Sequence, residues 1–548
     1  MHKALIPLIV ALLCWRSLAE DSPVSETAKP SMGFNLDADN PGRLTFSGTD
    51  SADLFTQEVN ESFKGVLARD YVSKPDGRFP PGFLNASPTN QPWYGTMWTR
   101  DGGTFLRELV FWGYYQHACQ VAQLMMDYVG TNADGFVAFP RFIDPQRRLS
   151  GSEMDGQTAT IIGMVALWQR LPPNDPFRAS LYQFLHQPSS PVRGIHHFLE
   201  AGPLVPGSGE FGGGREHDNY SVVQNNLCAL ALLATANMED AAGEHATAKQ
   251  YRQDAKTLFQ NIEKYLINGK GSWIWGIDMK TMKPNQTDTD SAGNGGSGGL
   301  NGVVCMSADV LGVDPAHWPW QGAVVNGGKT FDELYAFPLR KDQFEKYGFW
   351  GQMNYTHKGL LTSPSYGQGY ALQDMLLFDK LAMAGHGLDF LAETTYKSPG
   401  VIFSYTNQIY GRLSPYYFYE RMYSPEAAGK IELTAGCGPL NLVNVSEPLK
   451  VARLIAGVDD TSLKQVQIIP RLPPSWSGYH LQDWPILTSH GVVRADISCE
   501  KMDGKINFAL QVTQGGTIPK LAVRLPDGKG TKWKSRDNVS TVKFSSAL

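Results

Sequence analysis

The sequence has few cysteines and no recognisable metal-binding motif. Six cysteines occur in 548 residues, at positions 14, 119, 228, 305, 437 and 499. They are too few and too widely spaced for a disulfide-stabilised scaffold, although one or two bridges would be compatible with them. Neither a CxxC pair nor an HExxH motif occurs. We therefore expect no metal site and no cofactor.

Basic charge and long apolar runs are also scarce. The formal net charge is −5, from 48 Lys and Arg against 53 Asp and Glu. A nucleic-acid-binding protein would need a positive field, so no nucleic-acid partner is expected. The apolar run from Ala4 to Cys14 is too short to span a bilayer, and no later stretch looks transmembrane. The sequence therefore predicts no membrane insertion.

The N-terminus has the pattern of a secretory signal peptide. Lys3 precedes the apolar run, and Ser17 and Ala19 supply the small residues typical of a cleavage site. We expect residues 1–19 to be removed and the protein to be secreted or periplasmic.

Hydrophobic periodicity divides the rest of the chain into three parts. Residues 20–50 are polar and predict an irregular N-terminal segment. Residues 51–462 are mainly helical in pattern, and residues 463–548 contain short β-rich runs separated by turns such as KMDGK and PDGKG. We expect helices over 51–69, 103–129, 156–171, 219–238, 244–267, 366–384, 386–397 and 445–457. Long loops, at 70–97, 202–215, 284–302 and 398–416, separate them, which is typical of an α/α architecture with its chemistry on the loops.

The stretch MWTRDGG, residues 97–103, is the first candidate binding motif. Arg100 and Asp101 could hydrogen-bond neighbouring sugar hydroxyls while Trp98, with Trp93 upstream, stacks on a sugar ring. The structural alternative makes Asp101 an N-cap for the apolar helix that follows. In SEMDGQ, Asp155 is likewise either an N-cap or a ligand contact.

Two further segments place carboxylates in loops. GSGEFGGGREHDNYS, residues 207–221, carries Glu210, Glu216 and Asp218 before an apolar helix, with Asp218 or Asn219 as the expected N-cap. Glu216 is well placed there to protonate a leaving oxygen, although it could merely complement the helix dipole.

The segment YYFYERMYSPE, residues 416–426, surrounds Glu420 with tyrosines, including Tyr419. A carboxylate among hydroxyls suits the activation of water, although a buried pair of Glu420 with Arg421 is the structural alternative. Two carboxylates from distant loops, with aromatic walls, point to glycosyl transfer to water. One acid protonates the glycosidic oxygen, and the other carboxylate either activates water or attacks C1.

These motifs resemble the inverting glycoside hydrolases with an (α/α)6 barrel, such as glucoamylases and α-L-rhamnosidases. WTRD at 98–101 resembles the motif that holds the terminal sugar in glucoamylase-like enzymes. The loop REHDNYS at 215–221 resembles their acid-bearing loop, which implies that Glu216 is the general acid. YERMYS at 419–424 is similar to the Trp-Glu-Arg-Trp segment of rhamnosidases, which implies that Glu420 is the base. LIAGVDD and VQIIPRLPPSW, within 454–476, resemble the rhamnosidase transition into a β-sandwich.

The resemblance implies an (α/α)6 catalytic barrel over 51–462 followed by a small antiparallel β-sandwich over 463–548. It implies an inverting glycosidase with a carbohydrate substrate, with exo action as in glucoamylases and rhamnosidases. The residues themselves leave open the sugar, the anomer, the linkage, exo or endo action and the oligomeric state. Glu210 remains an alternative acid. A lyase or epimerase on the same barrel, with His196, His197 or His217 as base, is a second hypothesis, and a non-catalytic glycan-binding protein is a third.

Overall fold

The computed structural model divides the chain into two compact units, Met1–Asn35 and Leu36–Leu548. All described residues belong to the second unit. They are 39–72, 80–86, 95–144, 151–207, 219–284, 296–357, 360–363, 365–397, 422–423, 441–528 and 530–548.

The helices of the described chain form an inner and an outer layer. The inner helices are α2 (Thr99–Trp112), α4 (Met154–Arg170), α7 (Val222–Ala242), α9 (Gly296–Leu311), α12 (Ser365–Leu377) and α14 (Leu442–Ala456). Each packs against the next, and α14 packs back against α2, so the ring closes. This closed ring confirms the predicted (α/α)6 barrel.

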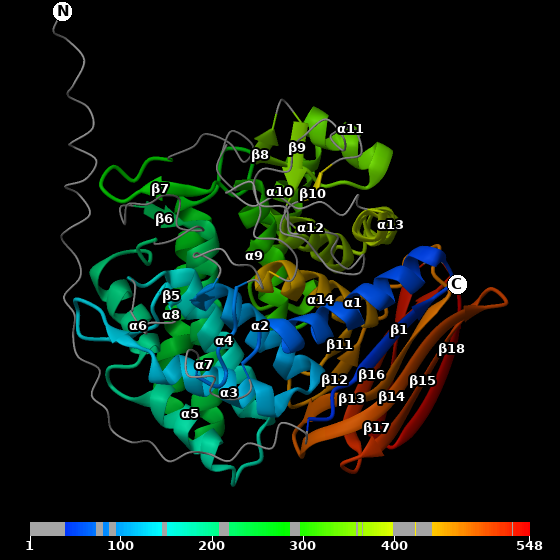
Figure 1. The fold of residues 1–548 in the computed structure, drawn as a ribbon, viewed down its shortest axis with the longest axis horizontal. Helices are drawn as coiled ribbons and strands as arrows, with labels where there is room; N and C mark the ends of the chain where they lie inside the picture. Colours follow the sequence, from blue (N-terminus) through cyan, green and yellow to red (C-terminus); the bar gives the residue numbers. More distant parts are fainter. Residues whose placement is uncertain are drawn as a thin grey trace, which may run out of the picture. The chain divides into compact units, whose positions relative to one another are not determined.

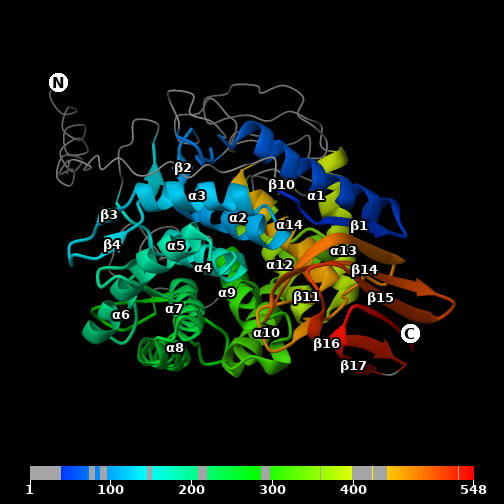
Figure 2. The same cartoon turned by 90° about the horizontal axis from the view of Figure 1, so that it is seen from below.

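The outer helices alternate with the inner ones along the chain. They are α1 (Asp50–Arg69), α3 (Tyr115–Asp127), α5 (Pro176–His186), α6 (Pro191–Ala201), α8 (His245–Tyr265), α10 (Gln321–Tyr335), α11 (Pro338–Tyr347) and α13 (Leu381–Lys397). Figure 2 shows α1 beside α13, where the first and the last outer helix pack together.

Residue patterns explain which helix goes to which layer. Every residue of α14 is buried, and α7 is apolar on nearly all sides, so both suit an enclosed position. In α8, the buried residues recur at helical spacing on one face, while the other face is polar. An amphipathic helix of this kind covers the barrel from outside.

The inner helices α2, α4 and α14 run parallel and begin at one end of the barrel. Gly103 of α2 lies against Thr160 of α4, and Gly163 of α4 lies against Leu106 of α2, in constant register. Side-chain hydrogen bonds join Thr104 to Ser446 and Glu108 to Arg453. Residue numbers rise together along α2 and α14, so these two helices also run in the same direction. The first turns of α2, α4 and α14 therefore lie at the same rim, here called the N-terminal rim.

After α14 the chain forms two sheets. The five-stranded sheet has the order β1 (Arg43–Ser47), β13 (Gly478–Thr488), β14 (Gly491–Met502), β15 (Lys505–Gln514) and β18 (Thr541–Ala547). The four-stranded sheet has the order β11 (Val458–Asp459), β12 (Val466–Ile468), β16 (Ile518–Asp527) and β17 (Gly530–Val539). Their neighbouring strands are antiparallel except β12 and β16, which are parallel.

The N-terminal segment corrects one expectation. We expected residues 20–50 to be irregular, but Arg43–Ser47 forms β1, which pairs with β13 and lies beside the C-terminal strands in Figure 1. Leu44 and Phe46 are buried while their neighbours are exposed, which is the alternation of an edge strand covering a core.

Two predicted helices were wrong in extent. The range 103–129 is interrupted where Gly113 takes a left-handed conformation with φ of 90°, which ends α2. The range 366–384 covers α12 and the start of α13, with a turn between them at Asp379, whose φ is 53°.

Two smaller features complete the fold. The four described cysteines, at 119, 228, 305 and 499, are buried free thiols. Within the described ranges, no helix combines the length and the apolar character that crossing a membrane requires.

Candidate active site

The start of α2 is fixed by a short strand pair. Met97–Trp98 forms β2, which pairs with β5 (Phe142–Ile143), and the backbone N–H of Thr99 donates to the carbonyl of Arg141 at 3.0 Å. The Trp98 ring lies 5.5 Å from the Phe142 ring, and the Arg141 guanidinium lies 4.9 Å from the centre of the indole. Trp98 is thus a half-buried residue at the N-terminal rim with a fixed ring.

The structure brings three of the predicted site residues together. Arg100 Nε lies 3.5 Å from Asp101 Oδ2, and Arg100 Nη1 lies 3.7 Å from Asp155 Oδ2. The Asp155 side chain is fully buried, and 15% of the Arg100 side chain is exposed. A Cβ atom added at Gly156 would lie 3.1 Å from the backbone nitrogen of Arg100, so this glycine allows α2 and α4 to approach closely.

Neither Asp101 nor Asp155 is an N-cap, so that alternative is wrong for both. Helix α2 begins at Thr99 with Trp98 as its N-cap, so Asp101 is the third residue of the helix. Asp155 is the second residue of α4, whose N-cap is Glu153. Both helices begin earlier than a simple search for a capping Asp implies. The two carboxylates instead lie in the first turns, where the helix dipole favours negative charge.

The third N-cap expectation also fails. Helix α7 is capped by Ser221, whose hydroxyl accepts from the Gln224 N–H at 3.3 Å, not by Asp218 or Asn219. Asn219 lies in β6 (Asn219–Ser221), which pairs with β7 (Gly276–Asp278).

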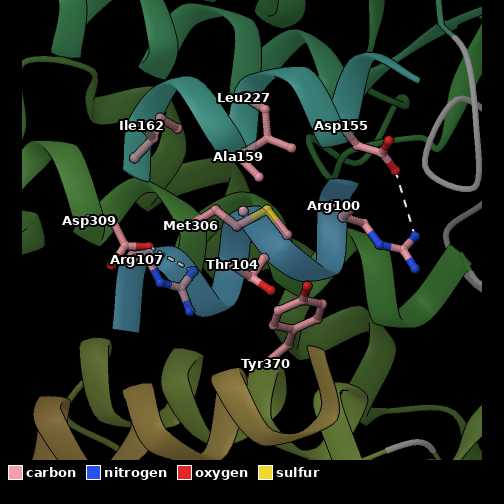
Figure 3. A pocket seen from close by; sticks show the side chains of 11 residues that line it. Arg100, Thr104, Arg107, Asp155, Ala159, Ile162, Leu227, Met306, Asp309 and Tyr370 are labelled. Carbon is pink, nitrogen blue, oxygen red and sulfur yellow. Dashed lines mark hydrogen bonds and ion pairs between the residues drawn. The ribbon is translucent and has the colours of Figure 1, made fainter. Parts of the chain in front are cut away.

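A cavity opens between the inner helices below Arg100 and Asp155 (Figure 3). It holds about 440 Å³ of space outside protein atoms, open solvent included. Residues of α2, α4, α7, α9 and α12 line it, namely Arg100, Gly103, Thr104, Arg107, Asp155, Ala159, Ile162, Leu227, Met306, Asp309 and Tyr370. A concave site with a few polar groups among apolar walls is suited to a small ligand.

The deep end of the cavity meets a buried network of charges. Arg107 donates to Glu108, Asp309 and Glu447 at 2.8, 3.2 and 3.1 Å. Arg453 donates to Glu108 at 2.8 Å and to Asp309 at 3.3 Å.

Lys450 completes this network by bonding Asp309 and the Cys305 carbonyl. Burial opposes ionisation of Asp309, but the Arg107, Lys450 and Arg453 cations outweigh it and hold the pKa of Asp309 below its ordinary value. Three basic side chains thus meet three acidic ones in this buried network.

Several expected site residues lie outside the described residues. They are Trp93, Glu210, Glu216, Asp218, Tyr419 and Glu420. In sequence, Glu216 precedes β6 and α7, and Glu420 precedes β10 (Met422–Tyr423). Their roles stay predictions.

The described histidines of the lyase hypothesis lie away from the cavity lining. His196 and His197 belong to the outer helix α6. His196 Nδ1 lies 2.8 Å from Asp254 Oδ2, and the His197 ring lies 5.2 Å from Phe136. His217 lies outside the described residues.

Sequence reasoning missed Tyr370 and Asp309, which reach the cavity from α12 and α9, and no local signal marks Tyr370. The weak signal for Asp309 is a carboxylate within the apolar run MSADVL, at a position of the helix where a core residue is expected.

Neither a sequence-family profile nor a curated protein matches the chain. Solved structures do. An α-L-rhamnosidase from Dictyoglumus thermophilum matches with a TM-score of 0.57 and 11% identity, over 93% of this chain and 51% of that one. A GH78 family rhamnosidase of Bacillus sp. GL1 matches with a TM-score of 0.54 and 12% identity, over 86% and 42%.

The chain therefore spans about half the length of these rhamnosidases. At this identity the likeness defines the fold, which is that of (α/α)6-barrel glycosidases carrying additional β-domains.

Proposed function

We propose that this protein is an exported glycoside hydrolase that removes a terminal sugar from an oligosaccharide, polysaccharide or glycoconjugate, with inversion at C1. The observation that carries the proposal is Arg100 held beside Asp101 and Asp155 at the mouth of a cavity in an (α/α)6 barrel. A guanidinium and carboxylates provide the donors and acceptors that sugar hydroxyls need. Trp98 at the same rim supplies an aromatic ring.

Charged side chains line the inner end of the cavity. Arg107 and Asp309, joined at 3.2 Å within the charge network, line this inner end, and we propose that it receives the end of a glycan. A pocket of this kind accepts a chain terminus, whereas an endo-acting enzyme needs a groove open at both ends.

The positions of Asp101 and Asp155 favour binding roles over acid catalysis. Both lie in the first turn of a helix and beside Arg100, so the helix dipole and the guanidinium stabilise their negative charge. An ionised carboxylate accepts hydrogen bonds from hydroxyls but has no proton to give. For the general acid we propose another carboxylate, that of Glu216.

The chain order supports this assignment of Glu216 and Glu420. Glu216 is three residues before β6, which leads into α7, and α7 contributes Leu227 to the cavity. Glu420 is two residues before β10, which pairs with β9 (Leu360–Ser363) ahead of α12, and α12 contributes Tyr370. In this scheme Glu216 protonates the leaving oxygen and Glu420 activates water.

The test is hydrolysis of a panel of α- and β-p-nitrophenyl glycosides and natural oligosaccharides by the wild type, Glu216→Gln and Glu420→Gln. We expect one sugar to be released, and kcat to fall by about 10²–10⁴-fold in each variant. Glu345→Gln, on the exposed side of α11, is the matched control and should keep full activity.

The anomer released first, followed by NMR, distinguishes inversion from retention. Retention would contradict the role of Glu420 as a base and make it a nucleophile. An ultraviolet-absorbing unsaturated product would indicate a lyase, and binding without product would indicate a glycan-binding protein.

A further inference from the structure

The polar side chains that line the cavity are not equally available to a ligand. Arg107 uses all three guanidinium nitrogens on Glu108, Asp309 and Glu447. Asp309 accepts from three cations, and the Thr104 hydroxyl donates to the Asp101 carbonyl at 2.9 Å.

Tyr370 is different. Its side chain is fully buried, it lines the cavity, and its hydroxyl makes no hydrogen bond in the described part of the chain. In Figure 3 the hydroxyl points from α12 towards α2, in the direction of Thr104 and Arg100. Burial raises the pKa of this phenol well above 10, so the hydroxyl keeps its proton and can both donate and accept.

A buried hydroxyl without a partner is costly, and native proteins rarely keep one without a reason. The Tyr370 ring is fixed beside Tyr366, with the ring centroids 5.6 Å apart, so the hydroxyl has little freedom to seek a partner elsewhere. The cavity that Tyr370 lines is the space in which such a partner would lie.

We infer that Tyr370 is a specificity-determining residue whose hydroxyl hydrogen-bonds one hydroxyl group of the terminal sugar inside the cavity. The inference rests on the proposed function and extends it, because it places a contact on α12, opposite the Arg100–Asp155 pair. It also predicts that the protein discriminates against a sugar that lacks this one hydroxyl.

Tyr370→Phe tests the inference because it removes a single oxygen and keeps the ring. The probes are the p-nitrophenyl glycoside that the wild type hydrolyses and the free monosaccharide that it releases. We expect KM and the inhibition constant of the monosaccharide to rise about tenfold. The melting temperature should stay the same or rise, because an unpaired buried hydroxyl is lost.

Tyr251→Phe is the matched control. Tyr251 is also fully buried with an unpaired hydroxyl, but it lies on the outer helix α8. This variant should gain or keep stability and leave both sugar constants unchanged.

Monodeoxy analogues of the same glycoside sharpen the result. One analogue should lose about tenfold in kcat/KM with the wild type, and Tyr370→Phe should process that analogue and the parent glycoside equally well.

Unchanged sugar affinity in Tyr370→Phe would overturn the inference while leaving the hydrolase intact. Loss of affinity together with a lower melting temperature would overturn it in favour of a structural role. A wild type that neither binds nor cleaves any sugar would remove the proposed function itself, and this inference with it.

Discussion

The charge network beneath the cavity predicts a large effect of a small substitution. Asp309→Asn removes one negative charge and keeps the size of the side chain. The network then holds three cations, Arg107, Lys450 and Arg453, against two carboxylates, Glu108 and Glu447. An uncompensated charge in a buried site has no water to stabilise it.

Removing one partner from a buried ion pair typically costs about 3–5 kcal/mol. We expect Asp309→Asn to lie in this range because its side chain is 5% exposed and interacts with three cations. With an unfolding entropy of about 2.1 cal/mol/K per residue over roughly 500 residues, this loss lowers the melting temperature by about 3–5 °C.

The stability difference between wild type and Asp309→Asn should depend on pH in a direction set by the pKa of Asp309. The pKa of Asp309 is lower in the folded protein than in the unfolded chain, where it is about 3.9. Its stabilising contribution is therefore complete above about pH 5 and is lost as the pH falls through the folded value. The stability gap between wild type and Asp309→Asn should be constant from pH 7 to about pH 5 and narrow at lower pH.

Thermal and urea unfolding of wild type and variants would measure these effects. Asp240→Asn is the matched control, because Asp240 pairs with Arg252 at 2.6 Å on the surface and should lose about 0–1 kcal/mol. Adding Lys450→Met to Asp309→Asn restores the charge balance, so the double variant should be more stable than the sum of the single effects predicts. The reasoning is refuted if Asp309→Asn loses no more stability than Asp240→Asn.

Two further predictions concern packing and burial. Gly103→Ala should lower both stability and activity, because the new Cβ would lie 2.8 Å from the Thr160 backbone nitrogen and push α2 away from α4. Gly328→Ala is the control: a Cβ atom there meets nothing within 4 Å, so this variant should be neutral or more stable. Unfolding and hydrolysis assays compare the two variants. Asp70→Asn should raise the free energy of unfolding at pH 7, because burial raises the pKa of Asp70 and so disfavours its carboxylate in the folded protein. The gain should vanish below about pH 4, where the unfolded chain is protonated too, and a loss of stability at pH 7 would contradict this account.

Much of the fold follows from local pattern. The range 244–267 matches α8 closely, because apolar residues recur there at helical spacing on a polar background. Helix α9 was missed as a whole, and so were α5, α6, α10 and α11. The start of α9, GSGG at 296–299, has the composition of a loop, yet it is helical next to α7 and α12. Tertiary packing overrides weak intrinsic preference in such segments.

Strand β1 was missed for a related reason. Five residues are too few for a reliable alternating pattern, and their partner β13 lies near the other end of the chain. Residues that are distant in sequence supply the sheet edge that turns Arg43–Ser47 into a strand.

The residues of the candidate site also fall into those that a local sequence motif predicted and those that it did not. Arg100 and Asp101 were found because they lie together in one short motif with Trp98. Tyr370 gave no such signal, because its neighbours in the cavity come from α2 and α9 and not from its own segment. Sequence reasoning finds a site where chemistry is concentrated locally and misses what the barrel itself assembles.

The charge network and the unpaired Tyr370 hydroxyl have complementary roles in this barrel. In the network, all three guanidinium nitrogens of Arg107 are bonded to carboxylates of α2, α9 and α14. These bonds fix the spacing of the three helices, and Arg107 has no nitrogen without a protein partner to offer a ligand. Tyr370 lies on α12, which packs against α9 and α14, so the same spacing fixes where its hydroxyl points. A rigid network that holds one hydroxyl without a partner preorganises that hydroxyl for a ligand. The entropy cost of ordering its side chain then falls on folding and not on binding.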